Sequence, residues 1–414
     1  AIDNATGNVV GWAGSANSQI DGVLIRRQSA STLKPFLYAS ALESGWTAAT
    51  LLPDSPIEFA SSADETYRPA NFDMRSHGVV RLRTALASSL NVPAVYTLSR
   101  VGLSAFIKTL RGLGFDLPQD SESRYGLGIA VGNAEVSLLE LVRAFSVFPR
   151  GGTLPELRVA AQQPRRSSRI FSSFTAWIIT NILSDPSARA MGFGTRTYFR
   201  TPFPTMFKSG TSSEFTNLWC VGATPRFTVG AWAGNFDGRT VINKTGSIVP
   251  TQLVVDVLKR VQADAPEFRK PPGVVAARID TLTGLRATGT SPSVRAEYFR
   301  DAEEVPDPDT LHPASGARNS LLLESLLGRK EQIRILFPVN GQVFYRDPTL
   351  PSAEQGIPLI AAARDGAGLS LFLDGTEIAN DAHDPSLTLP LTPGPHIVLA
   401  RTARGEDRVL FEVR

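Results

Sequence analysis

Ser31 and Lys34 stand three residues apart in a stretch with helical periodicity, so their side chains would lie on one face of a helix. A serine hydroxyl is a weak nucleophile until a base accepts its proton, and a lysine removed from water can be neutral enough to accept it. The pair therefore suggests covalent acyl transfer through a serine. Alone it is a weak signal, because a capping serine followed by a surface lysine gives the same spacing.

Two later stretches could complete such a site. Ser89-Leu90-Asn91 supplies a second hydroxyl and an amide that could hydrogen-bond a substrate, although serine and asparagine also favour helix ends for local reasons. In Lys208-Ser209-Gly210-Thr211 the glycine would allow a substrate to approach the backbone, the hydroxyls could bind a carboxylate, and the lysine adds positive charge. An ordinary polar turn is the alternative interpretation of this last stretch.

The order of the three stretches narrows the interpretation. Ser-x-x-Lys, Ser-x-Asn and Lys-Ser/Thr-Gly form the signature that penicillin-binding proteins and class A β-lactamases share in variant forms. The sequence RRQSASTLKPFLYASALESG (26–45) resembles the RQPGSTxKPFxYxxALExG of class A, bifunctional penicillin-binding proteins. ALASSLNVPAV (85–95) and GNAEVSLLELVRAFSVFPRGG (132–152) are similar to later segments of that family. Ser29-Ala30 stands where the family usually has Pro-Gly, Ser209 where threonine is commoner, and Asn217 where aspartate is frequent.

A second Lys-Thr-Gly, at residues 244–246, competes with Lys208 for the third position of the signature. In the family, that position is followed by an aromatic strand, a GxTP turn and a second strand. NLWCVGATPRFTVGAWAG (217–234) follows Lys208 in this way, whereas the segment after residue 246 resembles the closing loop and last helix of the family. We therefore predict that Lys208 belongs to the site and that residues 244–246 do not.

The elements that must hold these residues follow from apolar spacing. It predicts a helix over 31–45, two helices over 79–102 with a break before Pro93, an amphipathic helix over 135–152, and a hairpin over 218–236. Together with the resemblance they favour a β-lactamase/transpeptidase-like domain over residues 1–265, with an antiparallel sheet flanked by helices.

The remainder of the chain differs in composition and in apolar pattern, and this change predicts a multi-domain α and β protein. Residues 266–330 are rich in proline and charge and are expected to be a connector with a short β segment. Residues 331–414 contain a series of short strand-like runs and the turn Asp374-Gly375, typical of a small immunoglobulin-like β-sandwich. ILFPVNGQVFYRDPTLP, LFLDGTEI and LTPGPHIVLARTARGEDRVLFEV resemble the β domain that ends the penicillin-binding protein 1C subfamily.

The resemblance implies a peptidoglycan D,D-transpeptidase that penicillins also acylate. Ser31 would attack the bond between two D-alanines of a stem peptide and Lys34 would accept its proton. Ser89, in contact with Lys208, would pass a proton to the leaving amine, and Asn91 would hold the substrate amide.

The same resemblance assigns substrate binding to the third motif. Backbone N–H groups of Ser31 and Thr211 would stabilise the oxyanion, and the hydroxyls of Ser209 and Thr211, beside Gly210, would bind the terminal carboxylate. No cofactor and no metal are implied.

Location and partners are also expectations from the family. Its members carry a membrane anchor and a glycosyltransferase domain upstream, and they act at the periplasmic face of the bacterial inner membrane. The chain starts with AIDNATG, so we expect a soluble fragment that lacks both and whose C-terminal domain could recruit a cell-wall protein. A net charge of +3, with PRRSSR (164–169) as the main basic cluster, does not favour nucleic-acid binding.

Two alternatives remain open. A β-lactamase would share the signature, but the Glu-x-x-x-Asn pattern of its deacylating loop does not occur between residues 92 and 207. A scaffold or sensor would bind penicillin without turnover. A histidine-dependent hydrolase is disfavoured, since no Gly-x-Ser-x-Gly surrounds Ser31, and Cys220, the single cysteine, fits a small apolar strand residue better than a nucleophile.

Overall fold

The computed structural model describes most of the chain. These residues are 1–15, 19–55, 59–60, 66–72, 75–158, 166–193, 198–212, 215–241, 248–262, 264, 266–281, 283–289, 291, 293–308, 333–338, 342–344, 356–363, 369–382, 387–390, 392–403 and 405–413.

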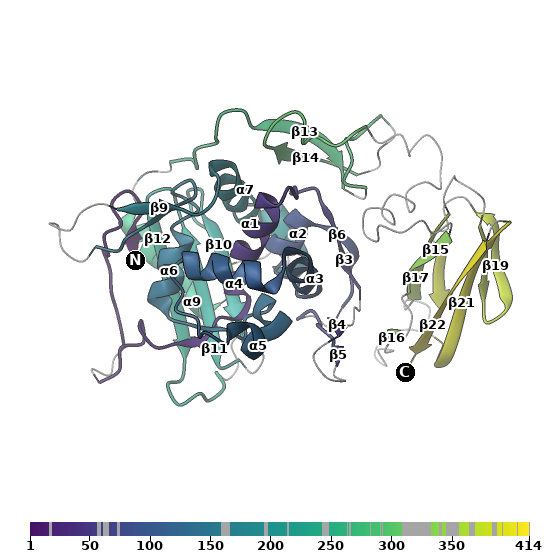
Figure 1. Cartoon of the computed structure of the whole chain (residues 1–414), viewed down its shortest axis with the longest axis horizontal. Helices are drawn as coiled ribbons and strands as arrows, with labels where there is room; N and C mark the ends of the chain where they lie inside the picture. The colour runs from purple at the N-terminus through teal and green to yellow at the C-terminus, as the bar shows by residue number, and fades with distance from the viewer. Residues whose placement is uncertain are drawn as a thin grey trace.

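A four-stranded antiparallel sheet lies at the centre of the N-terminal domain, in the order β1-β12-β11-β10 (Figure 1). Its strands are β1 (Ile2–Asp3), β10 (Met206–Thr211), β11 (Asn217–Ala223) and β12 (Phe227–Gly234). β11 and β12 pair along their length and turn at residues 224–226, so the hairpin expected over 218–236 is confirmed. Successive side chains of a strand point to opposite faces, and both faces of this sheet carry apolar side chains that need cover.

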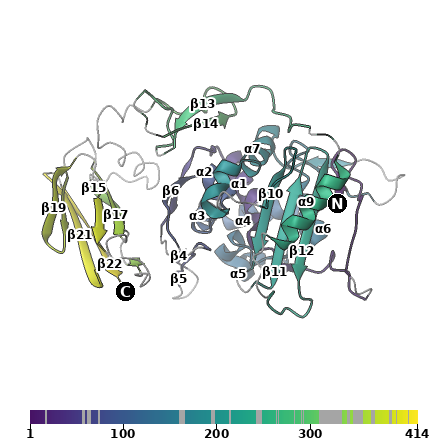
Figure 2. The same cartoon turned by 180° about the vertical axis from the view of Figure 1, so that it is seen from behind.

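Helices cover the two faces of the sheet. On one face α9 (Val249–Val261) lies along β11 and β12, where Val254 packs with Phe207 and Cys220 (Figure 2). On the other face Trp219 joins the main core together with Phe36 of α1. The other helices of the described residues are η1 (Ala30–Leu33), α1 (Lys34–Glu43), α2 (Leu82–Ala87), α3 (Val92–Val101), α4 (Leu103–Gly112), α5 (Ser121–Tyr125), η2 (Gly126–Ala130), α6 (Leu138–Phe145), α7 (Ser173–Leu183) and α8 (Pro186–Phe193). The predicted fold class of an antiparallel sheet flanked by helices is confirmed.

The helix predictions need two corrections. The segment 31–45 runs as η1 and then α1, as expected, and the region 79–102 holds two helices. Their break, however, lies at residues 88–91, and Pro93 stands in the first turn of α3 instead of ending a helix before it. Proline is tolerated there because N–H groups of the first turn have no partner inside the helix. The helix expected over 135–152 is shorter: Glu135–Val136 form β7, and α6 runs from Leu138 to Phe145 with Ser137 as its N-cap in a capping box with Glu140.

Short antiparallel pairs surround this body. They are β2 (Arg27–Gln28) with β7 (Glu135–Val136), β3 (Leu51–Asp54) with β6 (Gly78–Arg81), β4 (Phe59–Ala60) with β5 (Thr66–Tyr67), β8 (Thr153–Pro155) with β9 (Ser167–Arg169), and β13 (Val275–Asp280) with β14 (Val294–Phe299). The β13–β14 hairpin packs on the N-terminal domain, because the buried Glu297 carboxylate binds Arg81 and Arg83 and Tyr298 meets Trp177 edge-on. The short β segment expected in the connector is therefore held against the N-terminal domain.

The C-terminal region forms two sheets around a separate apolar core. One has the order β15-β17-β20 and the other β16-β22-β21-β18-β19. Buried side chains from both, such as Leu359 and Phe411, pack together, as expected for a small β-sandwich. The strands are β15 (Ile333–Phe337), β16 (Gln342–Phe344), β17 (Gly356–Ala363), β18 (Leu369–Leu373), β19 (Thr376–Ala382), β20 (Leu387–Pro390), β21 (Gly394–Thr402) and β22 (Gly405–Val413).

The predicted turn of the sandwich is present between β18 and β19. Asp374 and Gly375 both have positive φ, 50° and 82°, which is the backbone of the two-residue hairpin turn that Asp-Gly favours. Among the described residues, no helix combines the length and apolar character needed to cross a bilayer.

Candidate active site

Ser31 lies in η1, immediately before α1, and Lys34 is the first residue of α1. In a 3₁₀ turn the side chains at i and i+3 eclipse, so the local helix type aligns the serine with the lysine. The turn is anchored from outside, since the N–H of Ser29 donates to Ala134 and that of Ala30 to Gly132. Ala30 has a φ of 48°, in the left-handed region that favours glycine. The residue that replaces the family's glycine thus keeps a glycine-like backbone.

The third motif approaches this turn closely. A Cβ at Gly210 would lie 2.9 Å from the Thr32 methyl and 3.1 Å from the Ser29 carbonyl, so a larger residue would push β10 away from the turn that contains Ser31. Trp219 on the neighbouring strand donates from Nε1 to the Gln28 carbonyl at 2.9 Å. The sheet and the turn that contains Ser31 are therefore held together by direct contact.

Lys34 is fully buried at the junction of the first two motifs. Its Nζ donates to the Ser89 carbonyl at 2.7 Å and to Asn91 Oδ1 at 2.6 Å. Burial first, and then the charge of Lys208, hold the pKa of Lys34 well below its ordinary value, although the charge of Asp54 opposes them. Burial at this position therefore favours the neutral form of the amine.

The second motif forms the tight turn between α2 and α3. Ser89 has a φ of 60°, and this left-handed backbone directs its carbonyl to Lys34. Asn91 donates from Nδ2 to the Ala70 carbonyl at 2.7 Å. A carbonyl can only accept, so the amide orientation is fixed and Oδ1 is left to face Lys34.

Lys208 connects the third motif to the second. Its buried Nζ donates to Ser89 Oγ at 2.8 Å and to its neighbour's carbonyl, that of Ser209, at 2.6 Å. Burial lowers the pKa of Lys208 to about 7, with the charge of Arg189 acting in the same direction. Two lysines with lowered pKa thus meet around Ser89, one at its carbonyl and one at its hydroxyl.

Side-chain hydrogen bonds join four of the eight predicted site residues, Lys34, Ser89, Asn91 and Lys208, and Ser31 lies one helical turn before Lys34. Gly210 lies against the turn that contains Ser31. Ser209 and Thr211 are on β10, where they pair with Cys220 and Leu218 of β11. That their hydroxyls bind a carboxylate remains a prediction. The competing Lys-Thr-Gly at 244–246 lies outside the described residues.

Two aromatic side chains meet at the rim of the cluster. Phe72, next to the Asn71 and Ala70 partners of Asn91, packs edge-on against Phe215, four residues beyond Thr211, with ring centroids 5.9 Å apart. Phe72 is nonetheless 69% exposed. The pair connects the segment beside the second motif with the segment that follows the third.

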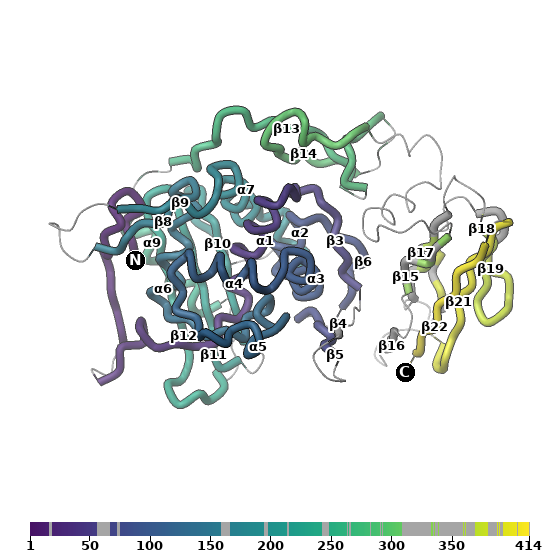
Figure 3. Tube along the Cα trace, in the orientation of Figure 1, coloured from purple at the N-terminus to yellow at the C-terminus, as the bar shows by residue number. Residues whose placement is uncertain are grey.

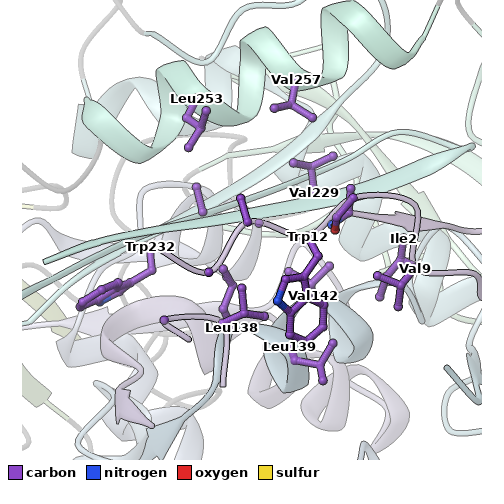
Figure 4. Close-up of a pocket in the computed structure, with 18 residues that line it drawn as sticks. Ile2, Val9, Trp12, Leu138, Leu139, Val142, Val229, Trp232, Leu253 and Val257 are labelled. Carbon is purple, nitrogen blue, oxygen red and sulfur yellow. The ribbon is translucent and has the colours of Figure 1, made fainter. Parts of the chain in front are cut away.

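An apolar pocket of about 270 Å³ lies elsewhere, between the N-terminal segment, β12, α6 and α9 (Figure 4). Trp12, Leu138 and Leu253 are among its lining side chains, and it contains none of the predicted site residues. The N-terminal segment that borders it runs along the edge of the domain in the trace of Figure 3. The arrangement of the chemical groups, and not this pocket, therefore defines the candidate active site.

Two known protein families match successive parts of the chain. Residues 1–259 match the family described as the penicillin binding protein transpeptidase domain, and residues 324–409 match the Penicillin-Binding Protein C-terminus Family. The chain belongs to the penicillin-binding protein transpeptidase family. The predicted membership of the class A penicillin-binding proteins is confirmed.

The chain is similar to class A penicillin-binding proteins in sequence and to solved penicillin-binding protein structures in fold. It is 32% identical over 66% of its length to penicillin-binding protein 1C of Escherichia coli, and 26% identical over 76% to penicillin-binding protein 1A of Pseudomonas aeruginosa. It spans 36% and 46% of those two relatives. The penicillin-binding protein 1A structure from Haemophilus influenzae matches 70% of this chain and 50% of that chain, with a TM-score of 0.59 and 23% identity. PonA1 of Mycobacterium tuberculosis, in complex with penicillin V, matches 65% and 79% with a TM-score of 0.56 and 18% identity.

The sequence motifs missed a second layer of polar residues in this penicillin-binding domain. Asp54 is fully buried behind the cluster, and Asn71 connects it to the second motif. Neither belongs to a motif, and His77 Nδ1 meets the Asp54 carboxylate at 2.5 Å. The Asp54 carboxylate is held by Asn71 and His77, which are 17 and 23 residues away in sequence, so this contact appears only in the folded chain.

Proposed function

We propose that this chain is a serine D,D-transpeptidase that cross-links peptidoglycan stem peptides and is acylated by penicillins at Ser31. The observation that carries the proposal is the unbroken contact among the three motifs. Lys34 touches Ser89 and Asn91, and Lys208 touches the Ser89 hydroxyl. These contacts bring the proposed base and proton donor together one helical turn from Ser31, the proposed nucleophile, which supports covalent acyl transfer.

The contacts of Lys34 support its role as the base for Ser31. A neutral lysine amine has two N–H donors and one lone pair. Both donors have acceptors, at Ser89 O and Asn91 Oδ1, so the lone pair is the valence left to receive a proton. Burial of the amine favours this neutral form.

In the first half of the reaction Ser31 Oγ would bond to the carbonyl carbon between the two D-alanines while its proton passes to Lys34. The oxyanion would be stabilised by the N–H groups of Ser31 and Thr211. The C–N bond would then break, and the leaving amine would gain a proton through Ser89, whose hydroxyl contacts Lys208. The product is an ester on Ser31 and a free D-alanine.

In the second half an amine of a neighbouring stem peptide would attack that ester and release Ser31. Asn91 would hold the substrate amide, and the hydroxyls of Ser209 and Thr211 would bind the carboxylate. A β-lactam presents a strained amide and a carboxylate to the same groups, so it would form the same ester. By analogy with the family, this activity would take place at the periplasmic face of a bacterial membrane, where the C-terminal sandwich would bind a cell-wall protein.

The test is acylation followed by intact mass. The folded chain would be incubated with benzylpenicillin beside Ser31→Ala and a matched control, Ser44→Ala, which removes an exposed hydroxyl from the end of the same helix. We expect a long-lived adduct of one penicillin in the wild type and in Ser44→Ala, and none in Ser31→Ala. Incubation with a D-Ala-D-Ala stem peptide and an amine acceptor should then give a cross-linked product.

Other outcomes would assign another function. An adduct that clears quickly with release of hydrolysed drug would indicate a β-lactamase. A stable adduct without any peptide product would favour the penicillin-binding scaffold. No adduct in a folded wild-type protein would overturn the proposal.

A further inference from the structure

Asp54 is an unusual neighbour for an active site, because its carboxylate is fully buried at the end of β3. It accepts two hydrogen bonds from Asn71 Nδ2, at 2.7 and 2.9 Å, one from the His77 backbone N–H at 3.1 Å, and it meets His77 Nδ1 at 2.5 Å. A buried carboxylate is costly unless hydrogen bonds satisfy it. These bonds satisfy the carboxylate and, in return, fix the position of Asn71.

Asn71 passes this constraint to the second motif. Its Nδ2 is used by Asp54 and by the Arg75 carbonyl at 2.8 Å, so its Oδ1 faces the other way and accepts the Asn91 backbone N–H at 2.8 Å. The preceding residue, Ala70, accepts Asn91 Nδ2 at 2.7 Å. Residues 70 and 71 therefore hold both the backbone and the side chain of Asn91.

We propose that Asp54 and Asn71 are positioning residues of the transpeptidase, which act through Asn91 to hold Lys34 in the orientation that takes the proton of Ser31. The inference rests on the proposed function, because it assigns a purpose to the contact between Asn91 Oδ1 and Lys34 Nζ at 2.6 Å. Neither residue touches the substrate path in this scheme. Their effect reaches the chemistry through one asparagine.

Asp54 also acts on Lys34 through its charge. Among the described residues, the charges that act on Lys34 are those of Lys208 on β10 and of Asp54 on β3, to which His77 is bound, and the Asp54 charge also acts on Tyr38, one turn along α1. Burial raises the pKa of Tyr38, so it stays neutral. The charge of Asp54 raises the pKa of Lys34 and that of Lys208 lowers it. Removal of the Asp54 charge should therefore make Lys34 lose its proton at lower pH.

The experiment measures the second-order rate constant of acylation by a fluorescent penicillin from pH 5 to pH 10. Asp54→Asn keeps the shape of the side chain but removes its charge, and we expect the acidic limb of its profile to move to lower pH. Asn71→Leu removes the acceptor for the Asn91 N–H, and we expect acylation to fall about 10- to 100-fold, as for a lost buried hydrogen bond, without a shift of the limb. Glu43→Gln is the matched control, since it removes a carboxylate from the far end of α1.

A double-mutant cycle separates positioning from general loss of structure. If Asn71 acts through Asn91, Asn71→Leu should cost little further activity in an Asn91→Ala background. Strictly additive losses, or a profile of Asp54→Asn that coincides with that of the wild type, would overturn the inference while the wild type is still acylated at Ser31. If Asn71→Leu fails to fold, the isosteric Asp54→Asn variant still decides. A wild type that is never acylated would remove the proposed function and this inference together.

Discussion

The two domains of this penicillin-binding protein differ in their buried charged side chains and in where their left-handed non-glycine residues lie. In the transpeptidase domain two lysines, Lys34 and Lys208, lie buried around Ser89, and Ala30 and Ser89 both hold left-handed backbone. In the described residues of the sandwich, His396 is the only buried polar side chain, and the left-handed non-glycine residue is Asp374 of the Asp-Gly turn. The described part of the sandwich thus avoids buried lysines and keeps its left-handed residue in a turn. The candidate site contains both buried lysines and strained backbone, as functional sites often do.

The largest expected effect comes from Lys34, the proposed general base. Lys34→Met should reduce the acylation rate by about 10²- to 10⁴-fold, since general base catalysis contributes that much. The rate constant for fluorescent penicillin checks it, with Lys108→Met, an exposed lysine on α4, as the control. A variant that acylates at the wild-type rate would show that Lys34 is only structural.

Next in size is the buried ion pair that holds β14. Glu297→Gln leaves Arg81 and Arg83 without their buried partner and should lower the free energy of unfolding of the transpeptidase domain by about 3 kcal/mol. In the sandwich, Glu406→Gln breaks an exposed pair with Arg401 and should cost less than about 1 kcal/mol. Urea unfolding with hydrogen exchange in each domain measures both. Equal losses would remove the contrast between the domains.

The third effect depends on pH. The folded pKa of Lys208 is about 7, below its value in the unfolded chain, so between pH 7 and pH 10 the unfolded chain binds more protons and stability should rise with pH. Relative to Lys208→Met, the wild type should gain about 2 to 3 kcal/mol in unfolding free energy from pH 7 to pH 9. A constant difference between the two proteins over that range would mean that Lys208 titrates normally.

A smaller effect should come from the strained turn before Ser31. Ala30→Gly removes a Cβ from a left-handed residue and should stabilise the domain by about 1 kcal/mol. Ala39→Gly, in the middle of α1, is the control and should destabilise by a similar amount or more. Thermal unfolding of the three proteins measures these differences. A loss of stability in Ala30→Gly would mean that packing of the Ala30 methyl group contributes more than its strained backbone costs.

The smallest effect is expected in the sandwich and has the opposite pH dependence. His396 Nδ1 meets the Asp374 carboxylate at 2.7 Å and Nε2 meets the Thr392 carbonyl at 2.6 Å, two acceptors that favour the protonated ring. Although burial opposes them, these bonds raise the pKa of His396. Its stabilisation is complete below the unfolded pKa and is lost as pH rises through the folded pKa. The stability difference between wild type and His396→Gln should therefore shrink from pH 6 to pH 8, measured by exchange in β21.

Local patterns were sufficient to predict most elements and the members of the three motifs. Apolar periodicity gave the helix after Ser31, and alternation with Asp374-Gly375 gave the strands and a turn of the sandwich. The helix break was predicted directly before Pro93, but it lies at residues 88–91. A proline in the first turn of a helix has the same sequence signal as one that ends a helix. The anchoring of β14 by Glu297 could not be predicted, since its partners Arg81 and Arg83 lie more than 200 residues away.

The sequence by itself determined the family, the fold of each domain and the candidates for the reactive groups, because these depend on residue types at short spacing. Only the tertiary structure decided the state of those groups. Burial of Lys34 and Lys208, which lowers their pKa, is the summed effect of segments distant in sequence, and no local pattern contains it. The same holds for Asp54 and Asn71, which become neighbours of Asn91 only when β3 and the second motif pack together.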